Sequence, residues 1–226
     1  MEHTRPRSIG IIMDGNRRYA KEHGMSKEAG HLLGHDKAVE VLEWCNEEGI
    51  EYVILYAFST ENWNRAPEEV SYLLDLFATK LPDLKRVQER GGAVVFMGDT
   101  ARFGEPLANV MRSIEESNPA NPKDTVAIAL SYGGRLEIVT AVNKLLARGK
   151  TSINEDDFAK ELWTANIPDP DLIIRTGGEQ RLSNFLPWQS VYSELFFTPT
   201  YWPEFSKEEF LAILNEFAAR ERRHGK

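Results

Sequence analysis

Short apolar runs alternate with amphipathic patterns along the whole chain. Near-continuous runs of four to eight mostly apolar residues are typical of strands buried on both faces of a parallel sheet. The pattern predicts six strands: Ser8–Met13, Tyr52–Ser59, Ala93–Gly98, Thr125–Leu130, Leu172–Thr176 and Leu195–Thr198.

Apolar residues between these runs recur at helical spacing. Ala38, Val41, Leu42 and Cys45 share one helix face, and Pro67 is well placed to begin a helix that continues to Arg90 with a kink at Pro82. Further helices are expected around 138–145, after Asn154, and after a capping box at Ser206 and Glu209. Alternating strands and helices predict one α/β domain over residues 1–226, with a mainly parallel sheet flanked by helices. Such sheets bind ligands at the carboxyl ends of their strands.

Composition narrows the functional class. The chain has 226 residues and a formal net charge of −8, which argues against general binding to nucleic acid. The single Cys45 excludes an internal disulfide and a cysteine-based metal cage. The first apolar run, Ile9–Met13, is too short for a signal peptide, and no run approaches the roughly 20 residues that span a bilayer. We therefore expect a cytoplasmic protein.

The first predicted strand leads directly into a charged segment. Asp14 and Gly15 follow it, and Arg17 and Arg18 come immediately after. A carboxylate beside an anion site suits Mg²⁺, which carboxylates and phosphate oxygens share. Lys27 and His31 add further capacity to bind an anion. A turn in which Asp14 caps a helix and both arginines are solvated explains these residues equally well, so both interpretations stay open.

Two more polar clusters follow predicted strands. Ser59–Arg65 combines hydroxyls, an amide, an aromatic ring and a cation, although a capped loop with Trp63 as a packing residue is the alternative. Arg175–Phe185 places Arg175, Arg181 and Ser183 around Gly-Gly, a set that suits a diphosphate. Together with the apolar helix faces, these clusters indicate a reaction between two diphosphates with apolar bodies.

These clusters, in this order, resemble the cis-prenyltransferases. The resemblance covers Ile9 to Gly225 and rests on five segments: Ile12–Arg18, Gly30–Gly34, Tyr56–Trp63, Ser131–Arg135 and Arg175–Glu179. It implies an α/β fold with a mostly parallel sheet, helices around it and a hydrophobic tunnel. It also implies Mg²⁺-dependent addition of isopentenyl diphosphate to an allylic diphosphate with formation of cis double bonds.

The resemblance assigns roles to residues at matching positions. Asp14 corresponds to the metal-binding catalytic aspartate, and Glu194 to a second metal carboxylate. Asn62 is at a position often assigned to proton transfer, but a neutral amide is a poor base, so we expect it to position substrate while a substrate phosphate or Asp14 accepts the proton. The expected allylic diphosphate site is Gly15, Asn16, Arg17, Arg18, Tyr19, Lys27 and His31. The other expected substrate-binding residues are Ser59, Thr60, Glu61, Trp63 and Arg65, then Arg175, Arg181, Leu182 and Ser183, and finally Arg223 and Gly225 from a C-terminal Arg-x-Gly element.

Several finer expectations depend on this resemblance. The expected primer is farnesyl or geranylgeranyl diphosphate, and the expected product is a C50–C60 carrier lipid precursor that grows through a tunnel past Ala57, Phe77, Val126 and Ile128. A homodimer is expected to pair through Phe196, Phe197, Tyr201 and Trp202, unless these aromatics pack within one subunit. Membrane contact is expected through the product only. A short-chain synthase, an irregular enzyme that joins two allylic diphosphates, a non-catalytic partner subunit and a plain phosphate-binding module remain alternatives. Asp14, Asn62 and Arg175 argue against the partner subunit, because such subunits have lost these residues.

Overall fold

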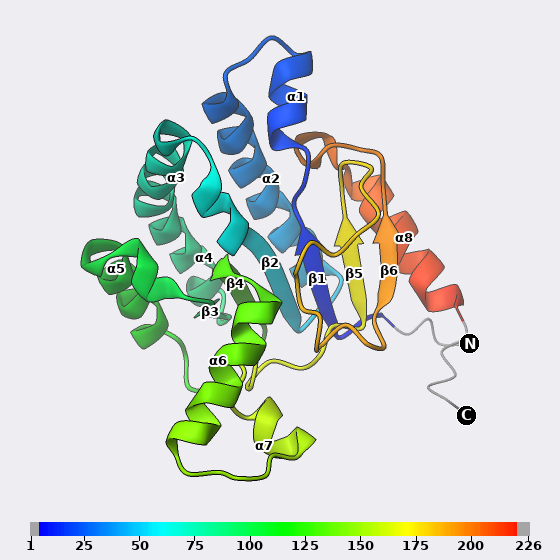
Figure 1. Ribbon diagram of the computed structural model, residues 1–226. Helices are drawn as coiled ribbons and strands as arrows, with labels where there is room; N and C mark the ends of the chain where they lie inside the picture. The colour runs from blue at the N-terminus through cyan, green and yellow to red at the C-terminus, as the bar shows by residue number, and fades with distance from the viewer. Residues whose placement is uncertain (1–4, 221–226) are drawn as a thin grey trace.

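A six-stranded sheet forms the centre of the molecule in the computed structural model, which describes residues 5–220 (Figure 1). All of its pairings are parallel, and its strand order is β3-β4-β2-β1-β5-β6. The strands are β1 (Ser8–Ile12), β2 (Tyr52–Ser59), β3 (Ala93–Met97), β4 (Thr125–Tyr132), β5 (Leu172–Arg175) and β6 (Glu194–Phe197). Each expected strand is confirmed, with its ends within two residues of the prediction.

The helices also follow the sequence pattern, with one omission. The longer ones are α2 (Lys27–Glu47), α3 (Pro67–Lys80), α5 (Glu105–Glu116), α6 (Gly134–Ala147) and α8 (Lys207–Ala219), and the shorter ones are α1 (Asn16–Glu22), α4 (Lys85–Glu89) and α7 (Glu155–Ala159). Four 3-10 segments connect them: η1 (Thr60–Asn64), η2 (Leu81–Leu84), η3 (Thr100–Phe103) and η4 (Trp202–Glu204). Pro82 lies in η2, which interrupts the helical path between α3 and α4 as expected. Helix α5 was not predicted from the sequence.

Apolar side chains cover both faces of the sheet. On one face, α2, α3, α5 and α8 pack against alternate strand residues such as Ile11, Leu55 and Ile128. On the other face, the loops of residues 160–190 cover Ile12, Ile54 and Ala127. A smaller cluster joins α6 to α7. Burial on both faces explains why the strands read as continuous apolar runs.

The aromatic residues near the C-terminus pack within the subunit. Trp202 is fully buried, and its indole N–H donates a hydrogen bond of 2.7 Å to the carbonyl of Gly34 in α2. Phe196 also belongs to the main core. The expectation that this aromatic group forms a subunit interface is therefore wrong for Phe196 and Trp202, because both are already covered by their own chain.

None of the helices formed by residues 5–220 is long and apolar enough to cross a membrane.

Candidate active site

Asp14 lies just beyond the carboxyl end of β1, at the centre of a network of charged groups. Its carboxylate accepts a hydrogen bond of 2.8 Å from Arg175 Nη2 and forms an ion pair of 3.0 Å with Arg18 Nη2. Gly15 follows with a φ of 117°, and a Cβ there would lie 2.9 Å from the Tyr201 Cα. Only glycine accepts this conformation and this close approach, so Gly15 allows the chain to turn sharply after Asp14.

Arg175 joins two of the predicted clusters. Its guanidinium is almost completely buried at the end of β5, which runs beside β1. Besides its bond to Asp14, Nη1 donates 2.7 Å to the Ser183 hydroxyl and also contacts the carbonyl of Arg181. Neighbouring parallel strands end at the same edge, so residues 161 positions apart meet there.

Glu69 is a site residue that our sequence analysis missed. It lies in the first turn of α3 with 6% of its side chain exposed. Its carboxylate accepts a hydrogen bond of 2.9 Å from Arg65 and lies 3.6 Å from His31, 3.7 Å from Arg17 and 3.9 Å from Lys27. One buried carboxylate thus holds together four of the basic residues predicted to bind an anion.

The segment after β2 separates into binding and packing residues. Asn62 Oδ1 accepts a hydrogen bond of 3.0 Å from the Ser59 backbone N–H, so its amide N–H groups are the part that can contact a ligand. Trp63 donates 2.9 Å to the Ser131 hydroxyl and packs against Phe58. Thr60 lies against Gly133. Trp63 and Thr60 thus have structural contacts that explain them, which was the alternative interpretation for Trp63.

Some predicted residues lie outside this group. Tyr19 stacks on His23, with ring centroids 4.1 Å apart, and Leu182 packs against the core on the other face of the sheet. Glu194 forms an ion pair of 2.6 Å with Arg220, and the strand register places it level with Ile9. At about 3.3 Å per residue, it is about 16 Å from Asp14 along the sheet. The structure therefore does not bring Glu194 to Asp14 within one chain. Arg223 and Gly225 lie outside the described residues.

Three cavities meet beside Asp14. A basic cleft of about 840 Å³ runs along α1, and a central cleft of about 560 Å³ opens between the ends of β1, β2 and β5. An apolar cavity of about 120 Å³ continues between α2, α3 and the sheet. The basic cleft is lined by Met13, Asp14, Gly15, Asn16, Arg17, Arg18, Lys21, Gly24, Met25, Lys27, His31, Arg65, Glu179 and Arg181. The central cleft is lined by Ile12, Met13, Asp14, Asn16, His31, Tyr56, Ala57, Ser59, Glu61, Asn62, Arg65, Leu73, Arg175, Ser183 and Asn184.

Met13, Asn16 and His31 line all three cavities. Asn16 Oδ1 and His31 Nε2 are buried and have no hydrogen-bond partner within residues 5–220. Burial, and after it the positive charge of Arg65, lowers the pKa of His31, so its ring is neutral at pH 7. Unpaired buried polar atoms are costly, and a ligand seated where the cavities meet could satisfy both of these.

An apolar cavity lies in the region of the expected tunnel, but its walls differ from the prediction. Ala57, Phe77 and Ile128 line the apolar cavity as expected. Val126 is not among the lining residues; it is buried in the main core. The helix α2, which we had not placed there, forms one wall through residues from His31 to Leu42. The cavity therefore lies between two helices above the sheet rather than between one helix and the sheet.

The donor set at Asp14 fits Mg²⁺ bound together with a substrate. Residues 5–220 hold no group of three or more His, Cys, Asp or Glu side chains that could enclose a metal ion. Asp14, however, offers a carboxylate in the wall common to the basic and central clefts. Mg²⁺ usually binds through one or two carboxylates and completes its shell with phosphate oxygens and water. Arg18 and Arg175 each contact one oxygen of the Asp14 carboxylate, and each oxygen keeps a further lone pair with which it could bind an ion.

The fold and the site together define an enzyme class. Two polar clefts share an aspartate, and an apolar cavity begins at their junction, as a transferase of apolar groups between diphosphates requires. Comparison with known proteins agrees: residues 12–225 match the family described as "Putative undecaprenyl diphosphate synthase". The chain belongs to this prenyltransferase family.

Similar proteins align with nearly the whole chain. An isoprenyl transferase of Thermus thermophilus is 45% identical, over 98% of this chain and 89% of its own length. The tritrans,polycis-undecaprenyl-diphosphate synthase (geranylgeranyl-diphosphate specific) of Thermoplasma volcanium is 44% identical over 100% and 91%. In structure, the lavandulyl diphosphate synthase of Lavandula x intermedia, solved with dimethylallyl diphosphate, superposes with a TM-score of 0.91 at 33% identity over 100% of both chains. The predicted family and fold class are thereby confirmed.

Proposed function

We propose that this prenyltransferase is a Mg²⁺-dependent chain-elongating enzyme that adds isopentenyl diphosphate to farnesyl or geranylgeranyl diphosphate with cis geometry. The observation that supports this most is the meeting of three cavities at Asn16 and His31. The allylic diphosphate would occupy the basic cleft with its hydrocarbon tail in the apolar cavity. Isopentenyl diphosphate would occupy the central cleft beside Arg175 and Ser183.

The chain's own residues support each stage of this reaction. The basic residues of the basic cleft neutralise the diphosphate that leaves as the allylic C–O bond breaks. Arg175 and Ser183 hold the second diphosphate, and the Asn62 amide N–H groups orient it, so that its double bond faces the allylic carbon. Mg²⁺ at Asp14 would supply further charge neutralisation on the leaving group. The electron pair of the isopentenyl double bond then forms the new C–C bond to the allylic carbon, and loss of a proton to a substrate phosphate or to Asp14 restores a double bond.

A direct test is incorporation of radiolabelled isopentenyl diphosphate with farnesyl or geranylgeranyl diphosphate, with and without Mg²⁺. We expect Mg²⁺-dependent products extended by five-carbon units, with cis geometry at the new double bonds. We also expect the main product to lie in the C50–C60 class. Absence of any incorporation would refute the assignment, whereas products of three or four units would refute only the expected length.

The irregular joining of two allylic diphosphates is the second candidate. It is favoured by the close superposition on lavandulyl diphosphate synthase and by the small volume of the apolar cavity. An assay with dimethylallyl diphosphate and no isopentenyl diphosphate separates the two functions. Product from that assay supports the irregular enzyme, and product only when isopentenyl diphosphate is present supports elongation.

We further propose that the enzyme is a cytoplasmic homodimer that contacts membranes only through its product. Leu136, Val139 and Leu146 lie on one face of α6 and remain exposed, which makes α6 a better pairing surface than the buried aromatic group. The net charge of −8 supports the expectation that nucleic acid is not a partner.

A further inference from the structure

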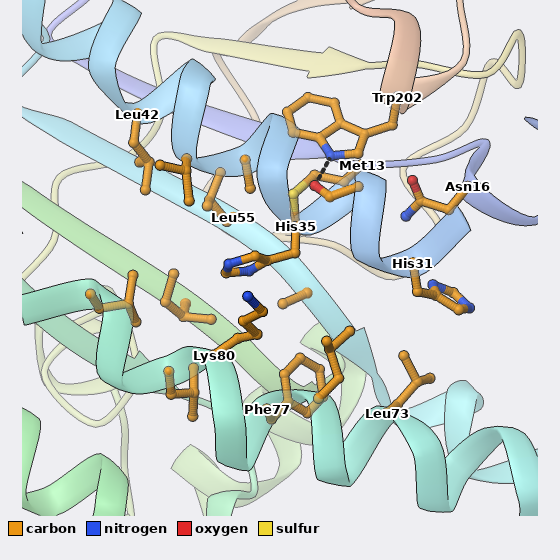
Figure 2. A pocket seen from close by; sticks show the side chains of 18 residues that line it. Met13, Asn16, His31, His35, Leu42, Leu55, Leu73, Phe77, Lys80 and Trp202 are labelled. Carbon is orange, nitrogen blue, oxygen red and sulfur yellow. Dashed lines mark hydrogen bonds between the residues drawn. The ribbon is translucent and has the colours of Figure 1, made fainter. Parts of the chain in front are cut away.

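Three polar side chains cross the gap between the two helices that enclose the apolar cavity. His35 belongs to α2, Lys80 ends α3, and Asp83 lies in η2. Asp83 Oδ2 is 3.7 Å from His35 Nε2 and 3.9 Å from Lys80 Nζ. Figure 2 shows His35 and Lys80 approaching each other between the helices. We name these three residues the polar clasp.

The polar clasp lies on the boundary between the apolar cavity and a second space. That second space is an outer groove of about 340 Å³ between α2 and α4, and it also contains charged residues such as Glu43 and Arg86. Lys80 lines the apolar cavity but not the outer groove, whereas Asp83 lines the outer groove but not the cavity. His35 lines both spaces. Val39, Leu42 and Leu84 also line both spaces, so an apolar surface continues past the clasp.

The volume of the apolar cavity makes this boundary important for a growing chain. The cavity holds about 120 Å³. A cavity of about 150 Å³ binds benzene, so this space fits about one five-carbon unit, and its walls must move apart to hold the expected C50–C60 chain. Each further unit pushes the hydrocarbon toward the gap between α2 and α3, where the clasp lies. A hydrocarbon that enters this gap must displace water from Lys80 and Asp83 or separate their charges, and both are unfavourable.

We propose that the polar clasp determines the length at which the product stops growing. The inference rests on the proposed chain-elongating function. In the wild-type enzyme, the charged groups resist passage of hydrocarbon into the outer groove, so the chain is released. Without these charges, the apolar surface formed by Val39, Leu42 and Leu84 is continuous, and the chain continues into the groove.

The test compares product lengths in variants of the full chain with farnesyl diphosphate, excess isopentenyl diphosphate and Mg²⁺. Two variants remove polarity but keep side-chain bulk: the double variant Lys80→Leu/Asp83→Leu and the single variant His35→Leu. A second double variant, Lys80→Ala/Asp83→Ala, removes both polarity and bulk. Asp75→Leu/Lys85→Leu is the matched control, because it removes the same two charges from exposed positions of α3 and α4. Mass spectrometry of the dephosphorylated products reports their lengths, and thermal melting confirms that each variant is folded.

We expect both leucine variants to shift the main product to longer chains by at least one five-carbon unit, with no shift in the control. Lengthening by alanine but not by leucine would show that bulk sets the length and would overturn the inference. Unchanged lengths in all variants, or an equal shift in the control, would overturn it too. A wild-type enzyme that incorporates no isopentenyl diphosphate would instead refute the proposed function, and the inference with it.

Discussion

Replacing Glu69 tests whether its contacts organise the basic cleft. Glu69→Gln keeps the shape of the side chain and removes the negative charge that Arg17, Lys27, His31 and Arg65 surround. Two effects oppose each other: the cleft becomes more positive, which favours anion binding, and the basic residues lose their common anchor. We expect the second effect to prevail, because a diphosphate brings its own negative charge but cannot hold Arg65 in place before it binds.

The structure allows a rough magnitude. A hydrogen bond to a charged group contributes about 1.5–3 kcal/mol, and an amide oxygen in place of the carboxylate keeps about half of it. The longer contacts add less. Arg17 and Lys27 are about half exposed, so each contributes well below about 1 kcal/mol, and the neutral ring of His31 contributes little. The variant therefore loses about 2 kcal/mol of interaction, which lowers the melting temperature by about 4–8 °C.

Steady-state kinetics with varied allylic diphosphate provides the assay. If most of this lost interaction serves to position the diphosphate, kcat/KM falls by at least about tenfold, since each 1.4 kcal/mol is a factor of ten. Glu68→Gln is the control, because Glu68 is exposed in the same first turn of α3 and shares its helix-dipole effect. An unchanged or higher kcat/KM in Glu69→Gln would show that the added positive potential prevails and that the reasoning is wrong.

Three further predictions concern the metal, the subunit contact and pH. Asp14→Ala should lower turnover by at least about a hundredfold with an unchanged circular dichroism spectrum. The reason is that the metal ion expected to neutralise the leaving diphosphate loses its carboxylate ligand. Near-normal product formation would contradict the role of Asp14. Val139→Lys/Leu146→Lys should convert a homodimer to monomers in sedimentation experiments, whereas a wild-type monomer with full activity would rule out the dimer. Burial lowers the pKa of His31 and of His35 in the folded protein below the value of 6.5 in the unfolded chain. The free energy of unfolding is therefore highest above pH 6.5 and decreases as pH falls through the lowered pKa values of the folded protein, because protonation of a buried ring is unfavourable. Melting temperatures from about pH 7 to about pH 5 should therefore fall, and less steeply in His31→Asn.

Local patterns were sufficient to predict the strands and most helices. Each strand is an uninterrupted apolar run because the sheet is covered on both faces, and that burial leaves a signal in the sequence itself. Helix α5 could also have been predicted. Leu107, Met111 and Ile114 are spaced as one face of a helix, and Gly104 and Pro106, which precede them, are typical of a helix N-terminus. Topology was also predictable in outline, because strand and helix alternate.

The site was predictable only where its residues follow strands. Asp14 and Arg175 were found because each ends a strand, and parallel strands bring such ends together. Glu69 could not be found in this way, because an acidic residue in the first turn of a helix is ordinarily explained by the helix dipole. Its four basic neighbours come from three separate segments, and only the folded structure shows that they converge. Glu194 illustrates the converse: resemblance gives a position in sequence, while the strand register puts this residue at the opposite end of the sheet from Asp14 of the same chain. Its role as a second metal carboxylate stays a prediction.

The helix α2 places residues at regular intervals along the apolar cavity. One continuous rod carries His31 at the junction of the clefts and Leu42 at the far part of the apolar cavity, eleven residues and about 16 Å further along the axis. The α2 residues that line the cavity recur with each turn, at intervals of about 5.4 Å: His31, then Gly34 and His35, then Ala38 and Val39, and then Leu42. Along this helix the wall of the cavity is therefore divided into segments that are each about one helical turn long. Inserting or deleting one turn in α2 together with α3 would move the boundary of this cavity by one such segment, so chain lengths in enzymes with this architecture should differ in discrete steps rather than vary continuously.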